Sequence, residues 1–128
     1  MALVDRLDRD LVERHGLPLA WYDVLVQLEA AGGEATMGVL ASNLLIAPSS
    51  CTRIVERMTA SGLVERRIDE HDHRVRHARL TPHGRTTLRA AARTHLAGIE
   101  LHFGAFLTDA EASLLGERFE AMRRSAGH

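Results

Sequence analysis

The chain has 128 residues, of which 45% are hydrophobic and 26% charged, and this predicts one soluble domain with a modest core. No apolar run approaches the roughly 20 residues of a membrane span. The start, MALVDRLDRD, lacks a signal-peptide apolar centre, and Cys51 is the single cysteine, so we expect a cytoplasmic protein with no membrane partner and no intrachain disulfide.

The net charge is only −1, but the charges are unevenly distributed. Residues 1–52 carry three Arg and seven acidic residues, residues 53–93 carry ten and five, and residues 94–128 carry three and five. The centre is therefore positive between two acidic ends, and every basic residue is an arginine. Such a centre can bind a polyanion although the total charge is not basic.

Four helices are predicted in the first half, over residues 2–14, 18–31, 36–44 and 48–61. Leucines at every fourth position mark the first, and Gly16 can end it. Thr36 is a candidate N-cap for the third, and Pro48 fits the first position of the fourth. The residues expected to face inward from the third and fourth helices are Val39, Leu40, Leu44, Ile54, Val55 and Met58.

A charged hairpin follows. Two β-type runs, 63–68 and 75–80, flank a tip at 69–74, and the second run leads directly into a helix start at Thr81-Pro82. Because a helix rich in hydroxyls and arginine precedes this basic hairpin, the layout is that of a winged helix-turn-helix that binds DNA.

The C-terminal part predicts a long helix over 82–106 and a last helix that begins at the capping box Thr108–Glu111. The last helix would carry a stripe of Leu115, Phe119 and Met122. Apolar helical faces at both ends of the chain favour a symmetric homodimer, and the alternative is packing within one subunit.

The order of these elements and five motifs resemble the MarR family of bacterial transcription regulators over about residues 17–122. The resemblance implies a mainly α fold with a small β-hairpin, in which dimerisation helices flank the winged helix-turn-helix. It also implies a dimeric regulator that usually represses genes and often leaves DNA on binding a small molecule. The motifs are Leu40-Ala41, SSCTRIVERM at 49–58, GLVER at 62–66, Asp72-His73-Arg74 and LTPHG at 80–84.

This resemblance predicts three parts of one domain. Residues 1–31 would form N-terminal helices that share in the dimer interface, residues 32–81 a DNA-binding lobe, and residues 82–128 the C-terminal dimer helices. The expected partners are a second copy of the chain and double-stranded DNA with a pseudo-palindromic operator, because a two-fold dimer matches a two-fold site.

The DNA-contacting residues are expected in the fourth helix and the hairpin. The first turns of a helix can reach base edges in the major groove. Arg53 could instead form an ion pair with Glu56. The family implies that Arg74 enters the minor groove and that Asp72 orients it or a nearby Arg. We expect Arg76 and Arg79 to contact phosphate or to lie on the exposed sheet face. The remaining candidates are Ser49, Ser50, Thr52 and Arg57.

One departure from the family pattern lies at Ala47, where relatives often carry Ser or a similar helix cap. The missing cap corresponds to about 1 kcal/mol, and Ser49 or Ser50 could compensate.

Other chemistry has weaker support. His71, His73 and His77 are separated by even numbers of residues, so a regular strand would place them on one face. With Asp69 or Asp72 they could form a zinc site, and a metal-binding or metal-sensing module is therefore the alternative function. We predict no metal and no cofactor. The same histidines could gain charge below about pH 6.5 and tighten DNA binding. We read Cys51 as a packed helix residue, and no catalytic motif is present, so we predict that the chain is not an enzyme.

A small aromatic or phenolic effector is a further expected partner. Its candidate contacts are His15, Trp21 and Tyr22, at the predicted junction of the first, second and fifth helices. The alternative is that the two aromatic residues are ordinary core residues.

Overall fold

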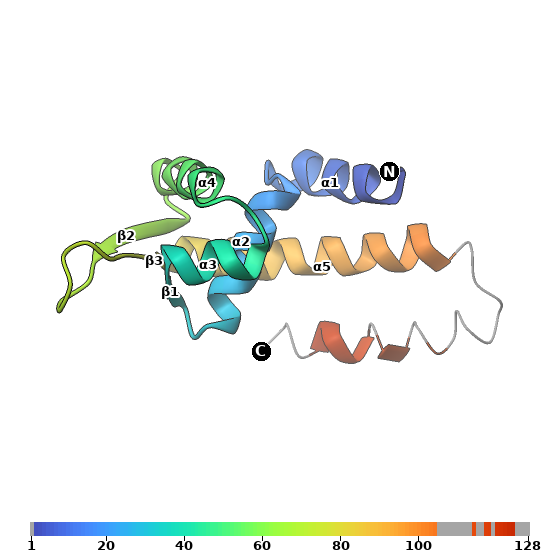
Figure 1. The fold of residues 1–128 in the computed structure, drawn as a ribbon. Helices are drawn as coiled ribbons and strands as arrows, with labels where there is room; N and C mark the ends of the chain where they lie inside the picture. The colour runs from blue at the N-terminus through green and yellow to red at the C-terminus, as the bar shows by residue number, and fades with distance from the viewer. Residues whose placement is uncertain (1, 105–113, 115–116, 119, 125–128) are drawn as a thin grey trace. The chain divides into compact units, whose positions relative to one another are not determined.

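The computed structural model describes residues 2–104, 114, 117–118 and 120–124, and it is mainly helical with a small antiparallel sheet (Figure 1). The predicted boundaries hold to within one or two residues wherever the described residues test them. The elements are α1 Ala2–His15, α2 Leu19–Ala30, β1 Glu34–Thr36, α3 Met37–Leu44, α4 Pro48–Ala60, β2 Val64–Ile68, β3 Arg76–Leu80 and α5 Pro82–Gly104.

The chain forms two compact units. The central unit is Ala20–Leu88, and the terminal unit combines Met1–Leu19 with Arg89–His128. The central unit therefore contains nearly all of α2, the helix pair α3–α4, the sheet and the first turns of α5.

The sheet has three strands in the order β1-β3-β2, and both pairs are antiparallel. The hairpin pairs Val64 with Leu80 at its base and Ile68 with Arg76 toward its tip. β1 adds to the other side of β3, where Thr36 lies opposite His77. Only the hairpin was predicted, because three residues are too few to show the alternation that marks a strand. We call β2, β3 and the connecting residues 69–75 the wing.

The core of the central unit comes mainly from the predicted apolar faces. Val39 was expected there, but its side chain is 51% exposed. Leu40, which was also expected there, is buried, and so is Ala41, because the inward face of the short helix α3 passes between them. The most deeply buried side chains are Val24, Leu25, Leu28, Leu40, Cys51, Val55, Met58 and Val64.

Helices α3 and α4 begin differently. The Thr36 hydroxyl accepts a hydrogen bond from the Val39 amide at 3.2 Å, as expected of an N-cap. α4 begins at Pro48 after Ala47, and no side-chain hydrogen bond caps it, so the expected compensation by Ser49 or Ser50 is wrong. The turn between the helices places Leu45 in the left-handed region, at φ 58°.

The wing joins α5 through a close backbone contact. The Thr81 hydroxyl donates to the Gly62 carbonyl at 2.6 Å and accepts from the Gly84 amide at 2.9 Å. A Cβ atom on Gly84 would lie 1.9 Å from the Leu63 carbonyl oxygen. Only glycine therefore allows α5 to start directly against the base of the hairpin.

In the terminal unit, α1 buries Leu7 and Leu11. At the end of α1, His15 Nε2 lies 2.7 Å from the Thr94 hydroxyl of α5. The predicted capping box 108–111 and two stripe residues, Leu115 and Phe119, lie outside the described residues. Several large apolar side chains are exposed here, namely Val4, Val12, Leu101, Leu114 and Met122.

Within the described part of the chain, no single helix is long and apolar enough to cross a membrane. One bent pair, Met37–Leu44 with Pro48–Ala60, passes the length and composition test together, with 109° between its helices.

Candidate DNA-binding surface

Helix α4 turns one face into the core and the other to solvent. Cys51, Val55 and Met58 are fully buried and fix the orientation of the helix. On the opposite side Arg53 and Arg57 are exposed, as is Ser49, while Ser50 and Thr52 are half-buried. The five candidates of this helix therefore lie along its outer side and near its N-terminus, where a groove could receive them.

Arg53 makes no ion pair among the described residues, and the alternative partner Glu56 is 3.6 Å from Arg66 instead. The guanidinium of Arg53 is thus open to an external acceptor. The Thr52 hydroxyl already donates to the Pro48 carbonyl at 3.0 Å. Its remaining lone pairs suit a hydrogen-bond donor, such as a base amino group, better than a phosphate.

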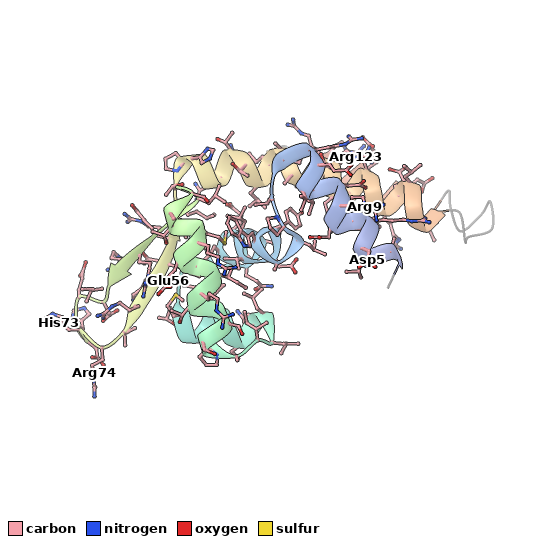
Figure 2. All side chains as sticks on the ribbon, turned by 90° about the horizontal axis from the view of Figure 1, so that it is seen from above. Asp5, Arg9, Glu56, His73, Arg74 and Arg123 are labelled. Carbon is pink, nitrogen blue, oxygen red and sulfur yellow. The ribbon has the colours of Figure 1, made fainter. Side chains whose placement is uncertain are left out.

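The wing holds one arginine in a defined position. The Asp72 carboxylate accepts from the backbone amide of Arg74 at 3.0 Å and from its guanidinium Nε and Nη2 at 3.1 Å each. These bonds, and first of all those from the side chain, lower the pKa of Asp72. The Arg74 side chain is nevertheless 91% exposed at the tip of the wing (Figure 2). The expected pairing of Asp72 with Arg74 is present in the structure.

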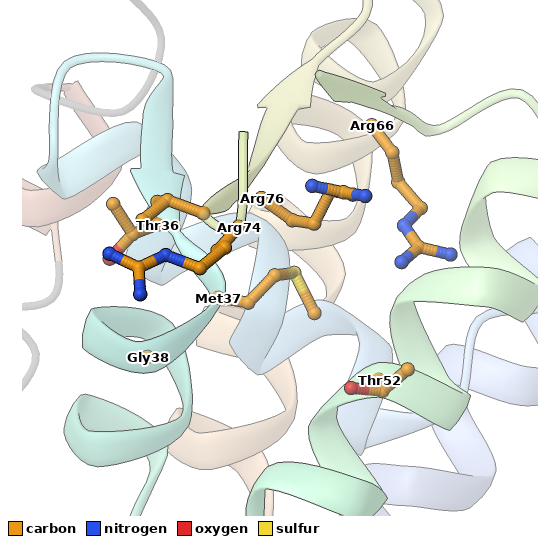
Figure 3. A pocket seen from close by; sticks show the side chains of 8 residues that line it. Thr36, Met37, Gly38, Thr52, Arg66, Arg74 and Arg76 are labelled. Carbon is orange, nitrogen blue, oxygen red and sulfur yellow. The ribbon is translucent and has the colours of Figure 1, made fainter. Parts of the chain in front are cut away.

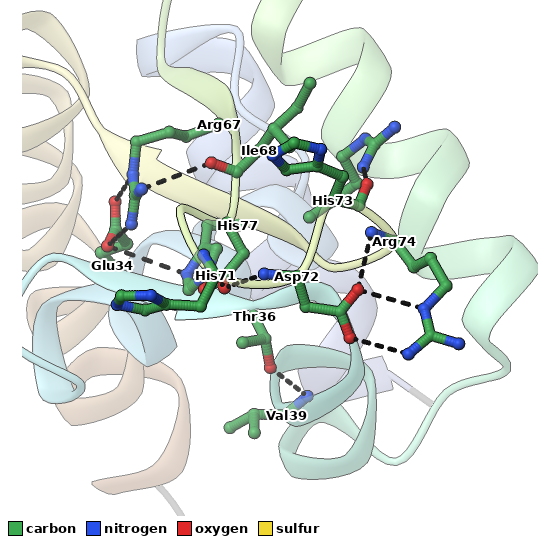
Figure 4. A network of polar contacts seen from close by, with 12 residues as sticks. Glu34, Thr36, Val39, Arg67, Ile68, His71, Asp72, His73, Arg74 and His77 are labelled. Atoms are coloured by element: carbon green, nitrogen blue, oxygen red, sulfur yellow. Dashed lines mark hydrogen bonds and ion pairs between the residues drawn. The ribbon is translucent and has the colours of Figure 1, made fainter.

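A second polar group, where the sheet meets the tip of the wing, was not expected from the sequence (Figure 4). Glu34 of β1 accepts from Arg67 of β2 at 2.9 and 2.7 Å, a bidentate pair that lowers the pKa of Glu34. His77 of β3 lies between two carboxylates. Its Nε2 is 2.8 Å from Asp69, and its Nδ1 is 3.8 Å from Glu34.

Asp69 also shapes the tip of the wing. One of its oxygens accepts from the amides of His71 at 3.0 Å and Asp72 at 2.9 Å. Bonds from His77, then Asp72, then His71 lower the pKa of Asp69 from 3.8 to about 2. An aspartate that accepts from the amides two and three residues ahead is a common turn signal. The position of Asp69 at the start of the predicted tip, two and three residues before these amides, was therefore the one clue to this arrangement in the sequence.

The other wing arginines have protein partners. Arg76 is half-buried and donates to the carbonyl of His73. Arg79 pairs across the strands with Glu65. Arg79 therefore lies on the sheet face in an ion pair, one of the two positions expected of it.

A hollow of about 480 Å³ lies between the wing and helices α3 and α4 (Figure 3). Arg66, Arg74 and Arg76 bring three positive side chains to it, and Thr52 adds a hydroxyl. Two of the site candidates from the wing and one from α4 thus line the same depression, although they are far apart in sequence. Its charge suits an anionic group such as a phosphate.

The histidines do not form a metal set. Among the described residues, no group of three or more His, Cys, Asp or Glu side chains could hold a metal ion. His77 lies in β3 between Asp69 and Glu34, while His71 and His73 are exposed at the tip of the wing. Burial raises the pKa of Cys51, and a buried thiol with a raised pKa is not a reactive thiolate.

The effector candidates are divided between the units. His15 belongs to the terminal unit and bonds to Thr94, whereas Trp21 and Tyr22 belong to the central unit. Tyr22 is 7% exposed, and burial, with Asp23 beside it, raises its pKa. Trp21 is half-buried.

A helix pair followed by a β-hairpin wing, within a three-stranded sheet, defines a winged helix-turn-helix protein. A sequence model of the MarR family matches residues 15–75. AbsC, a MarR family transcriptional regulator from Streptomyces coelicolor, is 30% identical, with 97% of this chain and 84% of AbsC aligned at a TM-score of 0.78. The chain belongs to the MarR family.

Sco3205, a MarR family regulator from Streptomyces coelicolor solved in complex with DNA, is also 30% identical, over 97% of this chain and 78% of its own, with a TM-score of 0.79. The organohalide-sensing regulator RdhR, bound to 2,4-dichlorophenol, shares the fold at a TM-score of 0.77 and 22% identity, over 97% of this chain and 72% of its own. No curated protein matches the chain. The prediction of a regulator rather than an enzyme agrees with the family.

Proposed function

We propose that the chain is a homodimeric, sequence-specific DNA-binding repressor. The observation that carries this proposal is the exposed Arg74, held by Asp72 beside an arginine-lined hollow at helix α4. A guanidinium fixed before binding loses less conformational entropy on contact. Sco3205, which is 30% identical, was solved in complex with DNA, and this supports a DNA-binding role for the chain.

Helix and wing would divide the contacts. α4 would enter the major groove with Arg53 and Arg57 outward, and its Ser49, Ser50 and Thr52 would touch bases or backbone. Arg74 would enter the adjacent minor groove, where a narrow A·T-rich segment attracts arginine. A phosphate would occupy the hollow near Arg66 and Arg76.

The dimer would be built from the terminal unit, which holds residues 1–19 and 89–128 of the predicted dimer segments 1–31 and 82–128. The exposed Val4, Val12 and Leu101 are at least 44% accessible in the single chain, and a second copy would remove them from water. Two recognition helices related by a two-fold axis require a pseudo-palindromic operator.

The test uses the DNA directly upstream of this chain's own gene, since repressors commonly control their own promoters. We expect the wild-type dimer to bind it in a fluorescence anisotropy titration, with affinity that falls steeply as salt rises. Arg74→Ala should weaken binding by about tenfold or more, while the mass measured by light scattering stays that of a dimer. Arg9→Ala, which removes an exposed arginine of α1, serves as the matched control.

Unchanged affinity for Arg74→Ala would contradict the role of the wing. A wild-type protein that binds upstream DNA no better than a scrambled fragment would contradict the sequence-specific function. Derepression of a reporter behind the same promoter in a deletion strain would separate a repressor from an activator.

Release by a small aromatic or phenolic effector is the remaining part of the proposal. RdhR, similar in fold, was solved with such a compound. Trp21 is the single tryptophan, so its fluorescence reports binding near it directly. We expect a phenol that releases DNA to quench Trp21, and Tyr22→Phe or His15→Ala to weaken that response. Release without any change in Trp21 fluorescence would move the effector site elsewhere.

A further inference from the structure

We propose that His77 is a positioning residue for the wing arginine and acts on Arg74 through Asp69 and Asp72. This inference rests on the proposed DNA-binding function of Arg74. It adds a residue that lies in the middle strand of the sheet and need not touch DNA. We call His77, Asp69, Asp72 and Arg74 the wing relay.

The first step of the relay joins the sheet to the tip. His77 Nε2 and Asp69 Oδ1 are 2.8 Å apart, and the side chain of His77 is only 14% exposed. Asp69 is ionised at neutral pH, because its pKa is about 2, and an ionised carboxylate can only accept. Nε2 of His77 therefore carries a hydrogen and donates the hydrogen bond to Asp69.

The second step joins Asp69 to the arginine. The other oxygen of Asp69 accepts from the Asp72 amide at 2.9 Å and so fixes the backbone that carries the Asp72 side chain. The Asp72 carboxylate in turn accepts from both the backbone and the guanidinium of Arg74. Each carboxylate thus bonds forward along the chain, and the orientation of Arg74 depends on the position of Asp69.

His77 itself is held on its other side. Its Nδ1 is buried, has no hydrogen-bond partner among the described residues, and lies 3.8 Å from Glu34, which Arg67 holds in a bidentate pair. β1 and β2 therefore enclose the imidazole from both neighbouring strands. Backbone bonds also close the tip, from the Asp69 amide to the Val75 carbonyl and from the Val75 amide to the Asp72 carbonyl, and the bond from His77 adds a side-chain anchor to them.

The experiment compares His77→Leu with His77→Gln. The amide nitrogen of Gln can reach nearly the position of Nε2 and donate to Asp69, whereas Leu fills the space without a donor. His83→Leu, which removes an exposed histidine at the start of α5, is the matched control. Hydrogen exchange of backbone amides and the NMR signal of Arg74 Nε–H are measured without DNA, and affinity is measured on the upstream DNA.

We expect His77→Leu to speed exchange at His71 and Asp72 by about tenfold, to broaden the Arg74 Nε–H signal, and to leave the Val55 amide in α4 unchanged. His77→Gln should restore protection, and His83→Leu should change none of these signals. His77→Leu should weaken DNA binding about tenfold in the wild type but not in an Arg74→Ala background, since the effect passes through Arg74.

Unchanged exchange at His71 and Asp72 in His77→Leu would overturn the relay. Faster exchange with unchanged DNA affinity would also overturn it, because the tip would then be anchored without consequence for Arg74. Equal loss of affinity with and without Arg74 would indicate a general folding defect, and the relay would fail.

If Leu unfolds the unit, His77→Ala replaces it as the variant without a donor, with the same expected signals. If the wild type binds no DNA, the proposed function fails, and the Arg74 Nε–H signal alone decides the relay.

Discussion

Helix α4 and the wing present arginines in opposite ways. Arg53 and Arg57 of α4 have no ion-pair partner in the described part of the chain, whereas Arg74 of the wing is bound by the Asp72 carboxylate, and the Asp72 backbone amide in turn donates to Asp69. The helix is oriented by three fully buried side chains, so its outer residues need no further support. The tip of the wing has no such core, and polar bonds replace it. An exposed arginine is thus held by a partner where packing does not already fix its backbone.

The largest expected effect concerns the base shared by both regions. Gly84→Ala would place Cβ 1.9 Å from the Leu63 carbonyl oxygen, and a backbone atom cannot turn away as a side chain can. We expect a loss of about 3 kcal/mol in the free energy of unfolding, measured by urea denaturation. Gly38→Ala in α3 is the matched control, since nothing lies within 4 Å of its added Cβ. It should be neutral or stabilising by about 0.5–1 kcal/mol. Equal stability of the two variants would contradict the close contact.

The contrast between held and free arginines predicts different effects of removing nearby acids. Asp72→Ala should weaken DNA binding by about tenfold, because Arg74 loses its orienting partner. Removing a negative charge near DNA would by itself strengthen binding. A loss of affinity in Asp72→Ala would therefore indicate that Asp72 orients Arg74. Glu56→Ala, which removes the partner of Arg66 on α4, should bind equally or more tightly. Anisotropy titrations at one salt concentration measure both, and tighter binding by Asp72→Ala would remove the orienting role.

The two regions should also respond differently to acid. The pKa of Asp69 is lowered to about 2, first by His77, so its ionised form stabilises the folded wing above the ordinary value of 3.8. That contribution declines as the pH falls from 3.8 through about 2. We expect the wing amides of His71 and Asp72 to lose NMR protection in this range before those of α4. Asp69→Asn should lack this step, and simultaneous loss in both regions would contradict the separation.

The smallest expected effect lies in the turn before α4. Leu45 has φ 58° and a side chain that is 91% exposed, so it contributes strain without burial. Leu45→Gly should stabilise the unit by about 1 kcal/mol in thermal unfolding, because glycine adopts this region freely. Leu45→Ala keeps the strain and should change little. If both variants gain equally, the exposed side chain rather than the backbone is responsible.

Most helices were predictable because their signals are local. Thr36, Pro48 and Gly62 mark boundaries through their own backbone and capping chemistry, whatever surrounds them. The Asp72–Arg74 pair was likewise predictable from a short motif. Val39 was not, because a helix as short as α3 leaves the direction of its inner face to the neighbours it packs against.

The sequence by itself thus determined the order of helices, the position of the hairpin and the residues at the two candidate DNA contacts. The tertiary structure decided what depends on distant partners. β1 exists because Glu34–Thr36 pairs with β3, more than 40 residues away in the chain, and its Glu34 then meets Arg67 and His77. No periodicity or motif encodes such a meeting, since hydrogen bonds between strands depend on register in space and not on neighbours in sequence.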